Sequence, residues 1–234
     1  MAGETQRIHL NSKRVDDYFF SAMTIWIAVV IFVGFARSYF LAGLFHAKLP
    51  SALVHLHGAI FSSWIILLIA QIVLAATGRI RWHVRLGLVG MLLAALMIVI
   101  GFATLFAAEH RHFQPDPIFT FDLLSLSIFG IFVLWAYLAR SHGPQHKRLI
   151  LLATLAITAQ GLSRWQYAVL DTNFAFYTVL NLPLAFLVGF DLWSRKKLNP
   201  VTVCGIAILA AMQLAYIPLA RTSLIHHLIA FLQK

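Results

Sequence analysis

Two histidines occupy the same place in a frame that the sequence repeats. The stretch ATGRIRWHVRLG contains His83, and the stretch ARSHGPQHKRLI contains His146. In both, an alanine closes an apolar run, a basic turn follows, and His-x-Arg-Leu opens the next apolar run. Two neutral imidazoles at one depth supply the two axial nitrogens that a low-spin b-type haem requires. The frame therefore predicts a haem between His83 and His146; the alternative is that each histidine only contacts lipid headgroups or caps a helix.

Residues close to the two histidines suit such a cofactor. On a helix, Gly87 and Gly90 share a face with His83, and small residues let a flat group or a second backbone approach closely. We therefore expect the two glycines to leave room for the porphyrin. The basic residues placed to pair with its propionates are Arg85, Lys147 and Arg148.

A second set of polar residues lies towards the other end of the apolar runs. Ionisable groups inside a membrane are expensive and mark functional sites by default, although they can also form purely structural ties. Asp122 is a natural ion-pair partner for Arg37 or Arg164. We expect the set to bind an anionic or quinone-like partner, or a second haem with an incomplete ligand set. Its members are Arg37, His55, His57, Asp122, Gln160 and Arg164.

The HLHG stretch at the start of the second apolar run contains two of these residues. His55 and His57 are two positions apart, so on a helix they point roughly 200° from one another. Only one of them can face a given interior site. The sequence does not choose between them.

Composition determines the environment in which these residues must be positioned. Of 234 residues, 61% are hydrophobic and 11% are charged, which is typical of an integral membrane protein. Only helices and closed barrels span bilayers, and apolar runs of this length are helices. The sequence thus predicts an all-α polytopic bundle with seven transmembrane helices, at residues 18–43, 53–76, 84–107, 118–140, 147–170, 174–194 and 200–220.

Around these spans the chain divides into three parts. We expect residues 1–17 to form a cytoplasmic segment, 18–222 the membrane domain, and 223–234 a short interfacial tail. Within the membrane domain, aligning the chain at His83 and His146 superposes the second and third spans on the fourth and fifth. The core, residues 53–170, is thus predicted to be a duplicated helical hairpin.

The distribution of basic residues predicts the orientation of the chain. Lys and Arg accumulate in short cytoplasmic loops, and three of them fall in each of four alternate segments. This pattern predicts an N-terminus in the cytoplasm and a C-terminus outside. The formal charge of +10 is spread over membrane-flanking turns and not gathered into one patch, so no nucleic-acid partner is expected. The segments are marked by Arg7, Lys13 and Arg14; Arg79, Arg81 and Arg85; Arg140, Lys147 and Arg148; and Arg195, Lys196 and Lys197.

Other classes of function fit the sequence less well. Cys204 is the only cysteine, so neither a disulfide framework nor a cysteine metal site is available. A zinc hydrolase needs three or four convergent ligands and a water site, to which HLHG and Asp122 could contribute. Pro183 and Pro218 interrupt predicted spans, as in transporters. A transporter, or a structural protein whose polar residues tie helices together, is therefore the competing class.

The four predicted core helices resemble those of the di-haem b-type transmembrane cytochromes that pass electrons from ascorbate-like donors. In that family the second and fourth core helices hold one haem, and His83 and His146 stand at the matching positions here. The first and third helices hold the other haem, and here they offer only His55 or His57 and nothing on the third. This resemblance implies electron transfer through haem b, with a quinone or another redox protein as partner.

The HVRLG segment also resembles an uncharacterised group of predicted bacterial membrane proteins that carry a His-Arg-x-Leu-Gly turn followed by a second His-x-Arg turn. This resemblance implies a multipass protein of the bacterial inner membrane. Neither resemblance decides whether the chain is an enzyme, and the sequence leaves its oligomeric state open.

Overall fold

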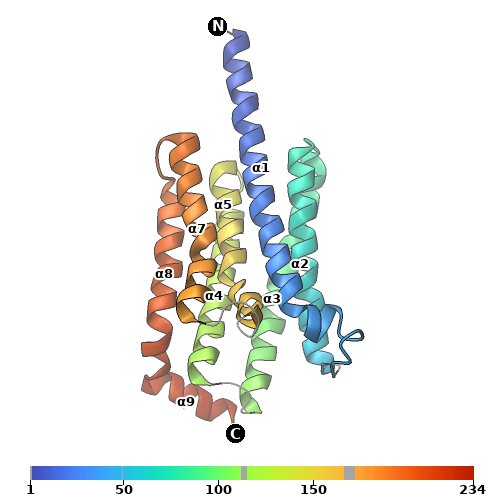
Figure 1. Cartoon of the computed structure of the whole chain (residues 1–234), viewed down its shortest axis with the longest axis vertical. Helices are drawn as coiled ribbons and strands as arrows, with labels where there is room; N and C mark the ends of the chain where they lie inside the picture. The colour runs from blue at the N-terminus through green and yellow to red at the C-terminus, as the bar shows by residue number, and fades with distance from the viewer. Residues whose placement is uncertain (1, 49, 112–114, 166–171) are drawn as a thin grey trace.

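The computed structural model describes residues 2–48, 50–111, 115–165 and 172–234, and every regular element in these ranges is a helix. Six helices are long and apolar enough to cross a membrane. They run side by side along one axis, with α1 extending past the others at its N-terminal end (Figure 1). The six are α1 (Ala2–Phe35, continued by a π-helical turn, Ala36–Phe40), α2 (Ala52–Ala76), α3 (Ile80–His110), α4 (Asp116–Leu138), α7 (Asn173–Arg195) and α8 (Pro200–Ala220).

The segment predicted as the fifth span, residues 147–170, is not one continuous helix. It consists of α5 (Gly143–Ala156), a turn at Ile157 and Thr158, α6 (Ala159–Leu162) and the 3₁₀ turn η2 (Ser163–Trp165). Residues 166–170 of the predicted span lie outside the described residues. The structure thus has six uninterrupted candidate spans and one interrupted segment where seven continuous helices were predicted.

The interruption coincides with a close crossing of α1 and α6. A Cβ atom added to Gly34 would lie 2.2 Å from the carbonyl oxygen of Gly161, so the two backbones touch where both residues are glycine. Just before the crossing, the Thr158 hydroxyl donates to the Thr154 carbonyl at 2.8 Å. Side-chain bonds of this kind often accompany bends in helices.

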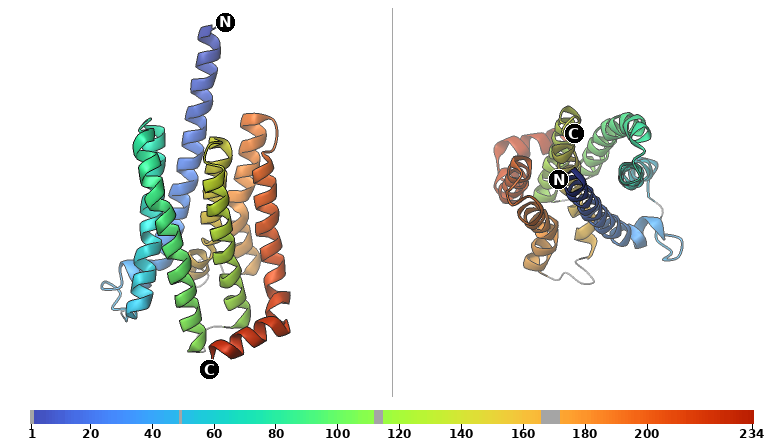
Figure 2. Two further views of the ribbon diagram at one scale, coloured as in Figure 1. Left: turned by 180° about the vertical axis from the view of Figure 1, so that it is seen from behind. Right: turned by 90° about the horizontal axis from the view of Figure 1, so that it is seen from above.

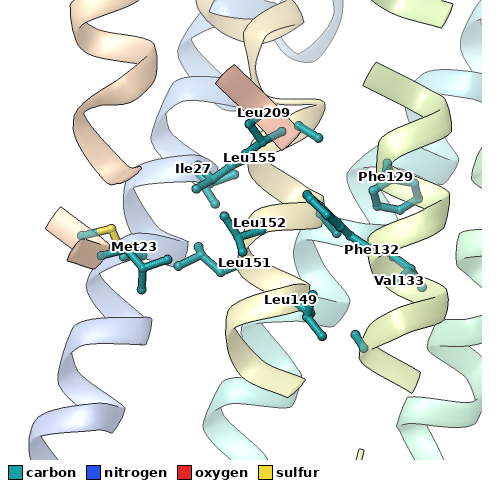
Figure 3. Packing of buried hydrophobic residues seen from close by; sticks show 14 of the residues in the cluster. Met23, Ile27, Phe129, Phe132, Val133, Leu149, Leu151, Leu152, Leu155 and Leu209 are labelled. Carbon is teal, nitrogen blue, oxygen red and sulfur yellow. The ribbon is translucent and has the colours of Figure 1, made fainter. Parts of the chain in front are cut away.

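Although it is short, α5 forms the centre of the hydrophobic core. Figure 3 shows its leucines lying between Met23 and Ile27 of α1 and Phe129 and Phe132 of α4. All but one of the residues from Arg148 to Ala156 are buried. By contrast, α3 exposes a row of large apolar side chains to the surroundings, as expected of a lipid-facing surface. That row includes Leu88, Leu92, Leu96 and Val99.

The C-terminal tail forms α9 (Ser223–Leu232), a ten-residue helix too short to cross a bilayer. It lies across the end of the bundle beneath α3 and α4 (Figures 1 and 2). Ile225 and Ile229 pack against Leu105 and Phe119, so the apolar side of α9 covers the ends of both helices.

Candidate functional site

The structure brings His83 and His146 together at the end of the bundle where the α2–α3 and α4–α5 turns lie. Each is the fourth residue of its helix, His83 in α3 and His146 in α5. Their ring centroids are 6.4 Å apart, and the two ring planes are nearly perpendicular, at 86°. The repeated frame in the sequence thus corresponds to a pair of facing side chains.

Each imidazole is fixed by a backbone carbonyl of the preceding helix in its own hairpin. His83 Nδ1 lies 3.3 Å from the Gln71 carbonyl oxygen of α2, and His146 Nδ1 lies 2.9 Å from the Ala136 carbonyl oxygen of α4. A carbonyl oxygen only accepts hydrogen bonds, so each Nδ1 carries the proton and donates. Each Nε2 is then an unprotonated nitrogen with a lone pair, the form that binds a metal.

The chemistry of the two rings suits a metal-containing cofactor. Their centroids are 6.4 Å apart, and each ring is bound at Nδ1, which leaves Nε2 as the nitrogen with a lone pair. Two such nitrogens are the donor set that a bis-histidine haem requires.

The glycines expected beside a porphyrin lie against α2. A Cβ atom on Gly87 would lie 3.4 Å from Gln71 Nε2, and one on Gly90 would lie 3.0 Å from Leu67 Cδ2. The tighter of the two contacts is at Gly90, which lets α2 pack closely on α3 near the Gln71 carbonyl that reaches His83. The glycines therefore contact α2, the helix that holds His83 through the Gln71 carbonyl.

Of the basic residues expected near haem propionates, Arg148 is occupied elsewhere. It is fully buried, and its Nε and Nη2 both donate to Asp191 Oδ1 of α7, the former at 3.1 Å. Its Nη1 donates to the Pro144 carbonyl at 2.7 Å. Asp191 Oδ2 accepts from the Asn199 backbone N–H at 3.1 Å and the Thr202 hydroxyl at 2.6 Å. This network joins α5, α7 and α8, and its Arg148 is two residues along α5 from His146.

The other two basic residues are more accessible. Arg85 is exposed, with its guanidinium 5.5 Å from the centroid of the Trp82 ring. Lys147 forms an ion pair with Asp16 of α1, and Arg195 of α7 contacts the same carboxylate at 3.2 Å. Asp16 thus ties α1 to α5 and α7 at the same end of the bundle.

The second polar set is only partly assembled. Gln160 Nε2 donates to Asp122 Oδ1 at 3.0 Å, and Arg164 lies near both Asp122 and His57. The Arg164 guanidinium lies 4.0 Å over the Phe35 ring. We call His57, Asp122, Gln160 and Arg164 the outer cluster. It gathers α2, α4, α6 and η2 at the point where the fifth segment is interrupted.

Two atoms of the outer cluster are buried without a hydrogen-bond partner among the described residues, His57 Nδ1 and Gln160 Oε1. The His57 ring stacks on Phe61, with centroids 4.1 Å apart. Unpaired buried polar atoms cost free energy, so they either mark a ligand's position or are retained at a loss of stability. The cluster is thus an interior polar site with open bonding capacity.

The remaining members of the predicted set lie elsewhere. His55 is exposed; its ring centroid lies 5.4 Å from that of Tyr39, whose hydroxyl donates to the His55 carbonyl. Arg37 lies 5.3 Å from the Phe45 ring centroid, in the segment after α1. Of the HLHG pair, His57 is therefore the histidine that faces the interior.

Several polar ties were not expected from the sequence. Asp16 and Asp191 are the clearest cases, and an acidic residue within an apolar run was the available signal for Asp191. Asn181 exchanges hydrogen bonds with Gln213 at 2.9 and 3.1 Å, which joins α7 to α8. In the described ranges, no group of three or more His, Cys, Asp or Glu side chains is arranged to hold a metal, as a zinc hydrolase would require.

No protein-family model, no curated protein and no solved structure matches the chain. Its function is therefore inferred from its own residues and their geometry.

Proposed function

We propose that this chain is a haem-binding electron-transfer protein of the bacterial plasma membrane, with His83 and His146 as the axial ligands of one b-type haem. One observation carries the proposal. Two histidines at matching positions of a repeated hairpin face each other at 6.4 Å, and each directs its Nδ1 to a backbone carbonyl. Such partners orient metal-bound histidines and increase their basicity.

The proposal includes the topology that the sequence predicts. The interrupted segment from α5 to η2 counts as the fifth of seven spans, with the N-terminus in the cytoplasm and the C-terminus outside. The Lys and Arg residues at the α2–α3, α4–α5 and α7–α8 turns support this orientation. The haem then lies near the cytoplasmic surface.

A haem held there would supply a one-electron redox centre. The protein's own residues set its position. The carbonyls of Gln71 and Ala136 hold the ligand protons on Nδ1, and Gly90 lets α2 approach closely enough to do so. Arg85 is the exposed cation on the same helix as His83, so we assign it to a propionate, whereas Arg148 positions α5 through Asp191.

We further propose that the outer cluster binds a quinone-like ring. The unpartnered His57 Nδ1 and Gln160 Oε1 offer hydrogen bonds to a carbonyl and a hydroxyl, and Phe35 and Phe61 offer flat apolar contacts. The competing function, transport or a structural tie, uses the same residues only to join helices. It predicts no haem and no effect of a quinone analogue.

Substitution of the ligands tests the haem proposal. We expect His83→Ala and His146→Ala each to lose the low-spin reduced α-band, and His146→Gly to regain it when imidazole is added. His142→Ala is the matched control, because His142 is exposed in the same turn and its side chain hydrogen-bonds only to Ser141 among the described residues. If both ligand variants kept the wild-type haem spectrum, the assignment of these ligands would be wrong.

A further inference from the structure

An apolar groove runs between α1 and α7 at the end of the bundle that carries the two histidines. It has a volume of about 720 Å³ and is open on one side. Phe19 of α1 and Phe190 of α7 both line it and stack on each other, with centroids 4.0 Å apart and planes 11° from parallel. The two helices therefore border an open apolar groove on the outside of the bundle.

One position shows that the groove is open to a guest. Gly189 of α7 lines it, and a Cβ atom added there would meet no atom within 4 Å. The flanking aromatic side chains, Phe186 and Trp193, are 51% and 65% exposed. In a bilayer, such a surface accommodates an acyl chain.

The end of the groove is basic. Val15 and Trp193 line it, and beside them in the sequence Asp16 of α1 and Arg195 of α7 contact each other at 3.2 Å. Arg195 Nε is buried and has no hydrogen-bond partner among the described residues. A donor that is desolvated and unpaired requires an acceptor.

The local charge balance favours an anion. Asp16 and Asp17 supply two negative charges at this end of α1 and α7, and Arg148 is neutralised by Asp191. Basic pockets between transmembrane helices bind the headgroups of anionic lipids. The cations that outnumber the two carboxylates are Arg14, Lys147, Arg195, Lys196 and Lys197.

We infer that this groove is a binding site for one anionic phospholipid of the leaflet on the N-terminal side. One acyl chain lies along Phe19, Gly189 and Phe190, and the headgroup phosphate accepts from Arg195 and Lys196. The surface is apolar along the helices and basic at their ends, which matches the apolar acyl chains and the anionic headgroup of such a lipid. This site does not depend on the proposed haem.

Native mass spectrometry of the detergent-purified full chain tests the site, with phosphatidylglycerol and phosphatidylcholine of identical acyl chains. We expect one phosphatidylglycerol per chain, bound more tightly than phosphatidylcholine by roughly fivefold for each basic residue engaged. Arg195→Gln should reduce that preference severalfold. Gly189→Phe should weaken the binding of both lipids, because its ring fills the groove.

Matched controls separate the site from general membrane attraction. Leu182→Phe changes an exposed position of α7 outside the groove, and Arg221→Gln removes a positive charge at the opposite end of the bundle. Both should leave lipid binding unchanged. Equal binding of the two lipids, or binding unaffected by Gly189→Phe, would overturn the inference. A wild-type dimer that Gly189→Phe converts to a monomer would also overturn it, since a second copy would then cover the groove.

Discussion

The histidine pair and the outer cluster differ in how their polar atoms are satisfied. At the histidine pair, each Nδ1 is bound by a carbonyl from a continuous helix of the same hairpin. At the outer cluster, four elements meet beside an interrupted helix, and His57 Nδ1 and Gln160 Oε1 have no partner. The first arrangement suits a permanently bound group that needs rigid ligands. The second arrangement suits a ligand that binds reversibly.

The largest effect is expected from breaking the network that positions the histidine pair. Asp191→Ala leaves Arg148 as an unpaired charge that is fully buried, which costs about 3–5 kcal/mol. We expect a strong fall in the thermal unfolding temperature and loss of haem. The double variant Arg148→Met/Asp191→Leu removes both charges and should recover most of the stability. If Asp191→Ala unfolded at the wild-type temperature, the network would have no positioning role.

An intermediate effect should separate the two regions. Gly34→Val places a side chain where the α1 backbone touches the Gly161 carbonyl, and overpacking of this kind costs about 1–3 kcal/mol. The change displaces Phe35 and Gln160, so titration with a quinone analogue should show weaker binding. The haem spectrum should stay unchanged. Gly43→Val serves as the control, since a Cβ atom there meets nothing within 4 Å.

A smaller effect is expected from a hydrogen bond between α2 and α5 that links the two hairpins. Trp64 Nε1 donates to the Thr154 hydroxyl at 3.2 Å, and Trp64→Phe removes this bond at a cost of about 1 kcal/mol. Thermal unfolding should register a modest decrease. Trp82→Phe, at a position that is 60% exposed, should cause none. Equal shifts in the two variants would mean that the hydrogen bond contributes nothing.

The smallest change in stability is expected at the outer cluster itself. His57→Leu replaces a ring whose buried Nδ1 is unpaired with an apolar side chain, so the unfolding temperature should stay the same or rise. Binding of the quinone analogue should nevertheless be lost. His55→Leu is the control, because His55 is exposed outside the cluster. A marked destabilisation by His57→Leu would favour a structural tie.

The sequence predicted the helical architecture and the membrane setting, because apolar runs of about 20 residues typically form helices that span a bilayer. Six of the seven predicted spans are continuous helices in the structure. The sequence missed the interruption of the fifth, since Ile157 and Thr158 carry no strong breaker signal and the close contact of Gly161 with Gly34 that coincides with it joins residues distant in sequence. Tertiary contacts of this kind cannot be read from local propensity.

Periodicity could place residues on a face but could not say what lies opposite. Gly87 and Gly90 share a face with His83 as expected, yet α2 is their neighbour. The partner of Arg148 could not be predicted either, because Asp191 is distant in sequence and lies in another helix. The choice between His55 and His57 likewise required the rotation of α2, which the pattern of apolar residues left open.

The central claim is that His83 and His146 hold one haem, and an absorption spectrum of the purified wild-type protein tests it most directly. The oxidised and dithionite-reduced spectra should be recorded, with haem quantified per chain. We predict a sharp reduced α-band of a bis-histidine haem at a stoichiometry near one. A spectrum without haem bands, from protein purified after expression with sufficient haem and reconstituted with haem, would contradict the account.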